Sequence, residues 1–270
     1  MPELPEVETI ARHLRPVLVD RSVVSVEVLW PRSIAKPTPD RFGRELTGAR
    51  FDGVGRRGKY LILALADGRA LLVHLRMTGR LLFYPEGGQL TSHTRVVIGL
   101  DGGASLHFVD QRKFGRLWLT HEPDSVLGRL GPEPLDPDFT PDELARRLLS
   151  RRTPIKAVLL DQRCVAGIGN IYADESLFLA GIDPRRPAWT LSHEEVAALH
   201  GAIRRVLSQA IGLRGSTLRD YRLPTDEQGD FQTKFHVFRR VGEPCPRCGR
   251  PIERVRIAQR STHYCPSCQC

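Results

Sequence analysis

Two Cys-x-x-Cys motifs near the C-terminus constrain the fold of this chain more than any other feature. They are Cys245-Pro-Arg-Cys248 and Cys265-Pro-Ser-Cys268, with 16 residues between them. This spacing is typical of a structural zinc site with four thiolate ligands, whereas a redox pair or a disulfide is the alternative. A tail of about 35 residues has too little apolar surface to fold without such an ion. We therefore expect Cys245, Cys248, Cys265 and Cys268 to bind one structural Zn²⁺.

The residues between the two motifs predict a β-hairpin that carries arginines. Residues 236–270 include seven arginines and two glutamates, an excess of five positive charges. Guanidinium groups form paired hydrogen bonds with phosphate oxygens, so such a hairpin is suited to a nucleic-acid backbone. The alternative is a solvated basic surface without a ligand.

The charge of the whole chain points in the same direction. Its 270 residues include 40 Lys and Arg against 31 Asp and Glu, and this excess favours nucleic acid or an anionic membrane surface. The longest apolar run, Tyr60–Ala66, is far shorter than the roughly 20 residues that cross a bilayer, so we expect no membrane-spanning segment. The acidic start of the chain differs from a secretory signal and leads us to expect a cytoplasmic location. Paired cysteines in that compartment favour metal over a disulfide.

The first part of the chain predicts an antiparallel β domain that begins with a helix. Tyr60–Ala66 and Arg69–Arg76 are strand-like and are joined by Asp-Gly, a strong hairpin signal. A helix is expected over about Pro5–Leu18. A proline-rich stretch later interrupts both kinds of periodicity. We therefore assign a β domain to residues 1–130 and a linker to residues 131–140.

Helix start signals dominate the next part of the chain. Thr140-Pro141-Asp142-Glu143 and Ser192-His193-Glu194-Glu195 each place a glutamate three positions after a hydroxyl residue, which is the pattern of a capping box. Apolar residues at helical spacing follow the second signal. These patterns predict a helical domain over residues 141–235, followed by the zinc-binding unit over residues 236–270.

The N-terminus carries a potential nucleophile. Loss of Met1 would expose Pro2 as a secondary amine with Glu3 beside it. An α-amino group titrates near pH 7.7 to 8.0, so a usable fraction is unprotonated at neutral pH and can form a Schiff base. In the alternative interpretation, Pro5 starts a helix and the nearby glutamates only complement the helix dipole.

A series of sequence blocks resembles the formamidopyrimidine-DNA glycosylase family. The opening Met-Pro-Glu-Leu-Pro-Glu-Val-Glu-Thr is similar to the start of that family, and further matching blocks follow in the family's order along the chain. These blocks are Gly58–Leu61, His74–Gly79, Gln111–Gly115, Leu130–Leu135, Gly167–Ala173 and Ala258–Arg260.

The resemblance implies an α+β fold with two lobes. The first would be an N-terminal β-sandwich lobe with a catalytic N-terminal helix, and the second a C-terminal helix–two-turn–helix lobe with a zinc-finger β-hairpin. The implied activity is base-excision repair by a bifunctional DNA glycosylase and AP lyase. Such an enzyme removes 8-oxoguanine and formamidopyrimidines from double-stranded DNA and cleaves the abasic site by β,δ-elimination. We expect a monomer that is cytoplasmic, and nucleoid-associated when it is bound to DNA.

The resemblance also assigns catalytic roles to three residues. Pro2 would attack the sugar C1′ of a flipped nucleotide and form an imine. Glu3 would protonate the sugar ring oxygen. Lys59 would neutralise a phosphate near the lesion, although a surface lysine whose stem packs on apolar groups is the ordinary alternative.

Five further residues match DNA-contacting positions of the family. Met77, Arg112 and Phe114 would fill the space that the flipped base leaves, a task that suits a thioether, a guanidinium and a flat ring. Without the family, Met77 and Phe114 would be interpreted as core residues. Asn170 and Arg260 would hold the phosphates that flank the lesion.

The loop that covers the oxidised base in this family corresponds to a segment with Ser216, Thr217 and Tyr221. This chain departs from the usual family pattern at Arg76 and at Arg214-Gly215-Ser216-Thr217, which leaves lesion preference open. One alternative is the sister branch that excises oxidised pyrimidines. The others are a non-catalytic protein that binds damaged DNA and, from the tail alone, a zinc-ribbon transcription factor.

Overall fold

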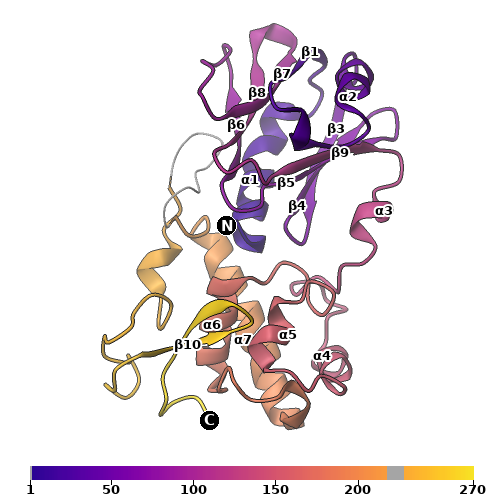
Figure 1. The fold of residues 1–270 in the computed structure, drawn as a ribbon. Helices are drawn as coiled ribbons and strands as arrows, with labels where there is room; N and C mark the ends of the chain where they lie inside the picture. Colours follow the sequence, from indigo (N-terminus) through magenta and orange to yellow (C-terminus); the bar gives the residue numbers. More distant parts are fainter. Residues whose placement is uncertain (1, 218–227) are drawn as a thin grey trace. The chain divides into compact units, whose positions relative to one another are not determined.

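The computed structural model describes residues 2–217 and 228–270 (Figure 1). The chain forms two compact units. We call residues 1–129 with 214–230 the β unit, and residues 130–213 with 231–270 the helical unit. Each unit is described by itself.

The β unit contains two sheets. The four-stranded sheet has the order β1 (Val23–Val28), β7 (Thr94–Leu100), β8 (Ser105–Asp110) and β6 (Gly79–Tyr84). The five-stranded sheet has the order β2 (Ile34–Lys36), β9 (Arg116–Thr120), β5 (Ala70–His74), β4 (Tyr60–Leu65) and β3 (Phe51–Arg57). All pairs are antiparallel except β2 with β9. The hairpin predicted around Asp-Gly is β4–β5, so that prediction is confirmed.

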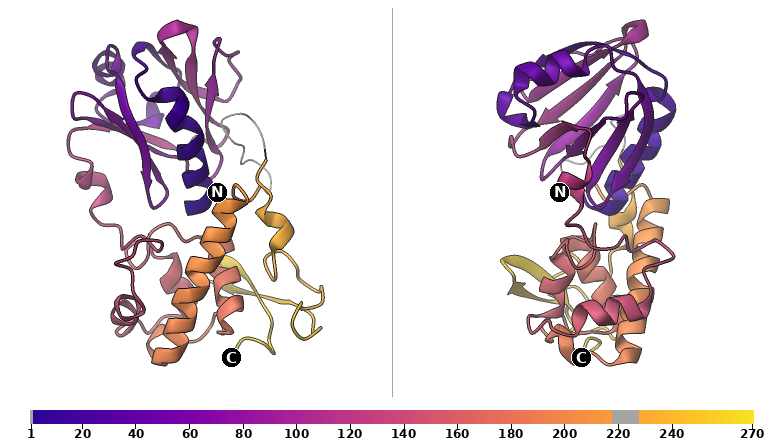
Figure 2. Two further views of the ribbon diagram at one scale, coloured as in Figure 1. Left: turned by 180° about the vertical axis from the view of Figure 1, so that it is seen from behind. Right: turned by 90° about the vertical axis from the view of Figure 1, so that its right-hand side faces the viewer.

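Both sheets and one helix share a single core. Helix α1 (Leu4–Leu18) buries Val7, Ile10 and Leu14 at helical spacing, in the same cluster as residues such as Leu63 of β4 and Phe108 of β8. The helix packs against β3 and β4, and Figure 2 shows it running alongside the strands. Two shorter helices, α2 (Pro39–Leu46) and α3 (Asp124–Leu127), complete the unit. The expected β-sandwich with an N-terminal helix is thus confirmed.

The helical unit is built from four α-helices, two short 3₁₀ helices and a hairpin. The α-helices are α4 (Pro141–Leu148), α5 (Ile155–Leu160), α6 (Asn170–Ala180) and α7 (His193–Gly212), and the hairpin is β10 (Glu253–Ile257) with β11 (Arg260–Tyr264). Both predicted N-caps are present, since Thr140 and Ser192 accept hydrogen bonds from the third residue of their helices. Within residues 2–217 and 228–270, every helix is too short or too polar to span a lipid bilayer.

A buried ion pair joins the hairpin to the helices. Lys156 of α5 and Asp174 of α6 are both 0% exposed, and the Lys156 Nζ lies 2.6 Å from Asp174 Oδ1. The same ammonium donates to Ser261 O at 3.0 Å and to Thr262 Oγ1 at 2.8 Å. The other Asp174 oxygen accepts the backbone N–H of His263 at 3.0 Å. These hydrogen bonds offset the cost of burying two charges and hold β11 against α5 and α6.

The next residue along α6 holds the chain where it enters the zinc-binding unit. Glu175 is fully buried and accepts the backbone N–H groups of His236, Val237 and Phe238 at 2.9 to 3.0 Å. A single carboxylate therefore satisfies three consecutive backbone donors that burial would otherwise leave unpaired.

Removal of Lys156 should destabilise the helical unit strongly, because it leaves the Asp174 carboxylate buried without its cation. We expect Lys156→Met to lower the free energy of unfolding by about 3–5 kcal/mol, measured by urea denaturation in zinc-containing buffer. Arg146→Met removes an exposed partner of Glu143 in the same unit and should cost less than about 1 kcal/mol. An equal, small loss in both variants would contradict this assignment.

Candidate functional site

The chain start is fixed by the first turn of α1. Pro2 and Glu3 are both buried, and Glu3 is 2% exposed. Glu3 is the N-cap of α1, and its backbone N–H donates to Glu6 Oε2 at 2.8 Å. Glu6 is the third residue of the helix, so it forms a capping box with Glu3. The predicted nucleophile and its acidic neighbour therefore lie in a water-poor environment at a helix N-terminus.

Glu6 also binds a segment far away in the sequence, a contact that the sequence alone does not predict. Its Oε1 accepts the backbone N–H of Ser216 at 2.7 Å. Gly215 has φ +77°, and a Cβ at this position would lie 2.8 Å from Glu6 Oε1, so a larger residue would be strained and would displace the Glu6 carboxylate. The Glu-x-x-Glu spacing was a visible sign of a capping box, but no local pattern indicates the contact with Ser216.

The two described ends of the predicted base-covering loop lie together. Ser216 forms a β-bridge with Asp230, and Thr217 Oγ1 accepts the N–H of Gly229 at 2.9 Å. Arg214 forms an ion pair with Asp230 at 3.0 Å. Ser216 and Thr217 are thus placed next to the start of α1 through Glu6, whereas Tyr221 lies outside the described residues.

Lys59 lies in the turn between β3 and β4 and is 6% exposed. Three residues earlier, Arg56 of β3 pairs with Glu8 of α1 at 2.8 Å. Burial alone would raise the pKa of Glu8, but hydrogen bonds and charges from Arg12 and Arg56 outweigh this effect and lower the pKa. The Glu8–Arg56 pair fixes this end of β3, and with it the Lys59 turn, against the second turn of α1.

His74 is buried at the end of β5, near this turn. Burial, followed by the charges of Arg76 and Lys59, lowers the pKa of His74 to about 3. The neutral ring accepts the backbone N–H of Arg76 through Nδ1 at 3.0 Å, and its centroid lies 4.5 Å from the Tyr60 ring in an edge-to-face arrangement. Lys59 and Arg76 therefore create a locally positive environment that is suited to an anionic ligand.

The three residues predicted to replace the flipped base form one cluster, which we call the wedge. Arg112 Nη1 lies 3.1 Å from Met77 Sδ, and Arg112 Cζ lies 4.8 Å from the Phe114 ring centroid. Phe114 is 47% exposed. An exposed aromatic ring next to a guanidinium plane is available for stacking on a base.

Asn170 and Arg260 also lie together, in the helical unit. Asn170 begins α6 and donates through Nδ2 to Ser261 O at 3.0 Å. Ser261 directly follows Arg260 in the sequence. Both residues line a hollow of about 430 Å³. Its lining is polar and rich in arginine, as expected for a phosphate site, and consists of Asn170, Phe238, Arg239, Arg254, Gln259, Arg260, Ser261 and His263.

The four predicted zinc ligands converge. The Sγ atoms of Cys245, Cys248, Cys265 and Cys268 all lie within 4.8 Å of one another. The Cys245–Cys268 and Cys248–Cys265 sulfur atoms are 3.9 and 3.5 Å apart, close to the roughly 3.8 Å expected for thiolates around tetrahedral zinc. The cluster fits one structural Zn²⁺. Cys164 lies elsewhere, and burial raises the pKa of its thiol to about 11, which makes it unreactive.

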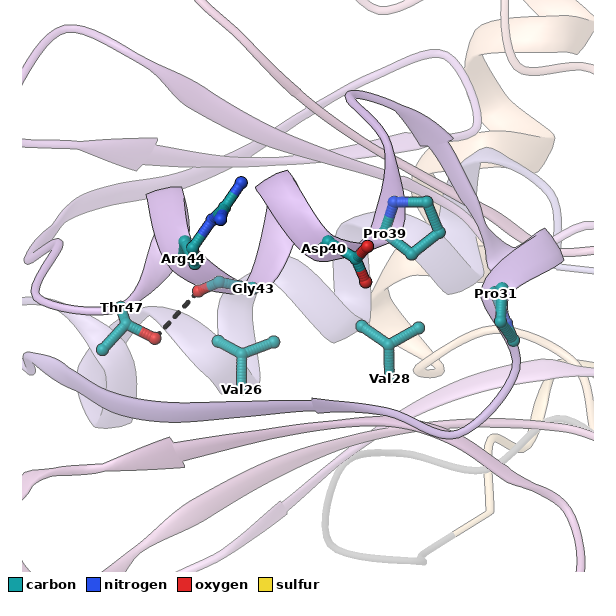
Figure 3. Close-up of a pocket in the computed structure, with 8 residues that line it drawn as sticks. All are labelled: Val26, Val28, Pro31, Pro39, Asp40, Gly43, Arg44 and Thr47. Carbon is teal, nitrogen blue, oxygen red and sulfur yellow. Dashed lines mark hydrogen bonds between the residues drawn. The ribbon is translucent and has the colours of Figure 1, made fainter.

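A hollow of about 630 Å³ lies between α2 and β1 (Figure 3). None of the predicted site residues lines it. Its lining mixes apolar and polar residues and consists of Val26, Val28, Pro31, Pro39, Asp40, Gly43, Arg44 and Thr47. This hollow therefore lies apart from the candidate active site of the β unit, which is identified by its side chains.

His74 should make the β unit sensitive to acid. An unfolded histidine takes up a proton below about pH 6.5, whereas native His74 stays neutral down to about pH 3, so acidification between these values favours the unfolded state. In this window, the free energy of unfolding of the wild type should fall more steeply than that of His74→Gln, by about 1.4 kcal/mol per pH unit. Urea denaturation at several pH values measures both slopes. Equal slopes would show that His74 does not stay neutral.

Family models match most of the chain. The formamidopyrimidine-DNA glycosylase N-terminal domain matches residues 1–117, and the formamidopyrimidine-DNA glycosylase H2TH domain matches residues 130–222. A zinc finger found in FPG and IleRS matches residues 242–269.

Individual proteins are similar over nearly the whole length. A formamidopyrimidine-DNA glycosylase of Moorella thermoacetica is 56% identical over 95% of both chains, and one of Chloroflexus aggregans is 51% identical over 100% of this chain and 98% of the relative. Among solved structures, a Lactococcus lactis FPG mutant in complex with Fapy-dG-containing DNA is 37% identical, with a TM-score of 0.93 over 99% of both chains. MutM (FPG) from Thermus thermophilus is 45% identical, with a TM-score of 0.89 over 99% of this chain and 98% of that one. This chain belongs to the formamidopyrimidine-DNA glycosylase family.

Proposed function

We propose that this chain excises oxidised purines from duplex DNA through a Schiff base on Pro2 and then cleaves the abasic site. The observation that carries the proposal is the buried start of α1, where Pro2 precedes Glu3 and the carboxylate of Glu6 accepts the backbone N–H groups of Glu3 and Ser216. A nucleophile, an acidic neighbour and the first residues of a base-covering segment therefore belong to one site. Family membership supports the same reaction.

The reaction starts at the amine that removal of Met1 exposes. Its nitrogen is unprotonated in part of the molecules at neutral pH and attacks the sugar C1′. The bond from C1′ to the damaged base breaks, and Glu3 protonates the ring oxygen as the sugar opens. The resulting imine makes the C2′ proton acidic, so the 3′ phosphate leaves by β-elimination. The 5′ phosphate then leaves by δ-elimination.

The remaining residues bind and deform the DNA. Lys59 supplies positive charge for a phosphate near the lesion. The wedge of Met77, Arg112 and Phe114 occupies the space that the extruded base leaves. Asn170 and Arg260 hold flanking phosphates, and the zinc-bound hairpin carries Arg260.

Complexes of related proteins support double-stranded DNA as the partner. The Lactococcus lactis FPG structures include complexes with Fapy-dG-containing DNA and with DNA that contains an abasic site. We propose the same partner for the present chain. We also propose that the chain is a monomer and acts in the cytoplasm. We also propose a division of the chain into a β domain (residues 1–130), a linker (131–140), a helical domain (141–235) and a zinc-binding unit (236–270).

Oxidised pyrimidines are a second candidate substrate. One observation favours them, since a complex of the wild-type Lactococcus lactis protein contains an oxidised pyrimidine in its DNA. The reaction on the sugar would be the same, and the segment that contains Ser216 and Thr217 would accept a different base.

Borohydride trapping tests the proposal on the chain that starts at Pro2. Reduction of the imine with a duplex that carries 8-oxoguanine opposite cytosine should leave a covalent adduct, and mass spectrometry of the peptide should place it on Pro2. Pro2→Gly should give less adduct because the secondary amine is lost, while Pro16→Ala, at another proline of α1, should retain it.

The other outcomes separate the alternatives. An adduct only with oxidised pyrimidine would identify the sister activity. An adduct on a lysine would contradict the role of Pro2, and the absence of an adduct with every lesion would leave a DNA-binding protein without this chemistry.

A further inference from the structure

A buried aspartate that the proposed mechanism does not use lies directly beneath the wedge. Asp110 ends β8 and is fully buried. Its Oδ1 accepts the hydroxyl of Thr78 at 2.5 Å and the backbone N–H of Arg112 at 3.2 Å. Its Oδ2 accepts the backbone N–H of Gly115 at 2.7 Å. The carboxylate thus receives donors from two separate loops.

These donors are next to the wedge side chains in the sequence. Thr78 follows Met77, and Gly115 follows Phe114. The Thr78 hydroxyl also accepts the backbone N–H of Arg112 at 3.1 Å, so the two loops are joined both directly and through Asp110. Every wedge residue therefore either donates to this carboxylate or precedes a residue that does.

The backbone around Asp110 is itself held in place. Its N–H donates to His93 O at 2.9 Å, and its carbonyl accepts Arg95 Nε at 2.8 Å. A Cβ at Gly115 would lie 2.4 Å from the Phe108 ring and 3.2 Å from Asp110 Oδ2, so the loop is tightly packed against β8. Between the wedge residues, Lys113 has φ 60°, a conformation that non-glycine residues rarely adopt without support from their surroundings.

Only a carboxylate suits this position. Three donors converge on the side chain, and an ionised aspartate offers two oxygens that only accept hydrogen bonds. An asparagine has one oxygen and an NH₂ group that would face at least one of these donors. The buried charge is compensated by the donors, and the hydrogen bonds to it are stronger than those to a neutral group.

We propose that Asp110 is a positioning residue that sets the wedge before DNA binds, by fixing the Met77–Thr78 loop to the Arg112–Gly115 loop. This inference rests on the wedge role in the proposed function. A pre-formed wedge spares the enzyme the cost of ordering exposed side chains when the base is extruded. Asp110 acts through Met77, Arg112 and Phe114 and takes no part in the sugar chemistry.

The test compares two substrates that differ in the need to extrude a paired base. One duplex carries 8-oxoguanine opposite cytosine, and the other carries a pre-formed abasic site. Asp110→Asn should slow base removal by about tenfold or more under single-turnover conditions, and should change cleavage at the abasic site by less than about twofold. Thr78→Val should show the same selective loss, whereas Thr78→Ser, which keeps the hydroxyl, should restore the wild-type rate.

Asp101→Asn is the matched control. Asp101 also accepts a backbone N–H in the β unit, from Ser22 at 2.8 Å, but it lies in the turn between β7 and β8. Asp101→Asn should leave the rates of base removal and of abasic-site cleavage unchanged. If thermal unfolding shows that Asp110→Asn does not fold, the comparison of Thr78→Val with Thr78→Ser tests the inference instead. Selective loss in Thr78→Val but not in Thr78→Ser would support it, and equal behaviour of the two variants would overturn it.

Phe114→Ala separates this inference from the function on which it rests. Slower base removal in Phe114→Ala, together with selective loss in Asp110→Asn, is the expected result. Slower base removal in Phe114→Ala with a wild-type rate in Asp110→Asn would overturn the role of Asp110 and leave the wedge role intact. If Phe114→Ala removes the base at the wild-type rate, the wedge role fails, and the role of Asp110 fails with it. An equal loss on both substrates in Asp110→Asn would show a purely structural role and overturn the inference.

Discussion

The candidate active site depends on the carboxylate of Glu6. One oxygen accepts the N–H of Glu3 and the other accepts the N–H of Ser216, so both are occupied by backbone donors. These bonds fix the main chain at the helix start and at the segment proposed to cover the base. Because Glu6 is buried, water competes little for either hydrogen bond. The residue next to the proposed nucleophile and the first residues of that segment therefore share a single anchor.

Buried acidic side chains fix loops at three other places in this basic protein. Asp110 holds the two loops of the wedge, Asp174 holds β11, and Glu175 holds the chain at His236. Each carboxylate is compensated by hydrogen-bond donors, most of them backbone N–H groups, which offset the cost of removing its charge from water. A ligand that is bound mainly by turns and loops requires those loops to be set in advance, and short acidic side chains achieve this with few rotatable bonds.

Local signals in the sequence were sufficient for several elements and for the cysteine cluster. The Asp-Gly hairpin, both helix caps and the four-cysteine cluster were predicted correctly because each depends on residues that are close in the chain or on a fixed ligand spacing. The contacts of Glu6 with Ser216 and of Lys156 with Asp174 were not predicted. No local pattern encodes partners that meet only after the chain has folded, and Lys156 resembles any other lysine in the sequence. The roles of the candidate site residues came from the resemblance to the family and stay predictions.

The central claim is that the nitrogen of Pro2 performs the chemistry. The most direct measurement is the single-turnover rate of strand cleavage at an abasic site, for the chain that starts at Pro2 and for the same chain with Met1 retained. With Met1 present, the Pro2 nitrogen is part of a peptide bond and has no lone pair available for attack. We therefore expect cleavage only when the amine of Pro2 is itself the N-terminus. Equal rates for the two forms would contradict the account and would assign the nucleophile to another residue.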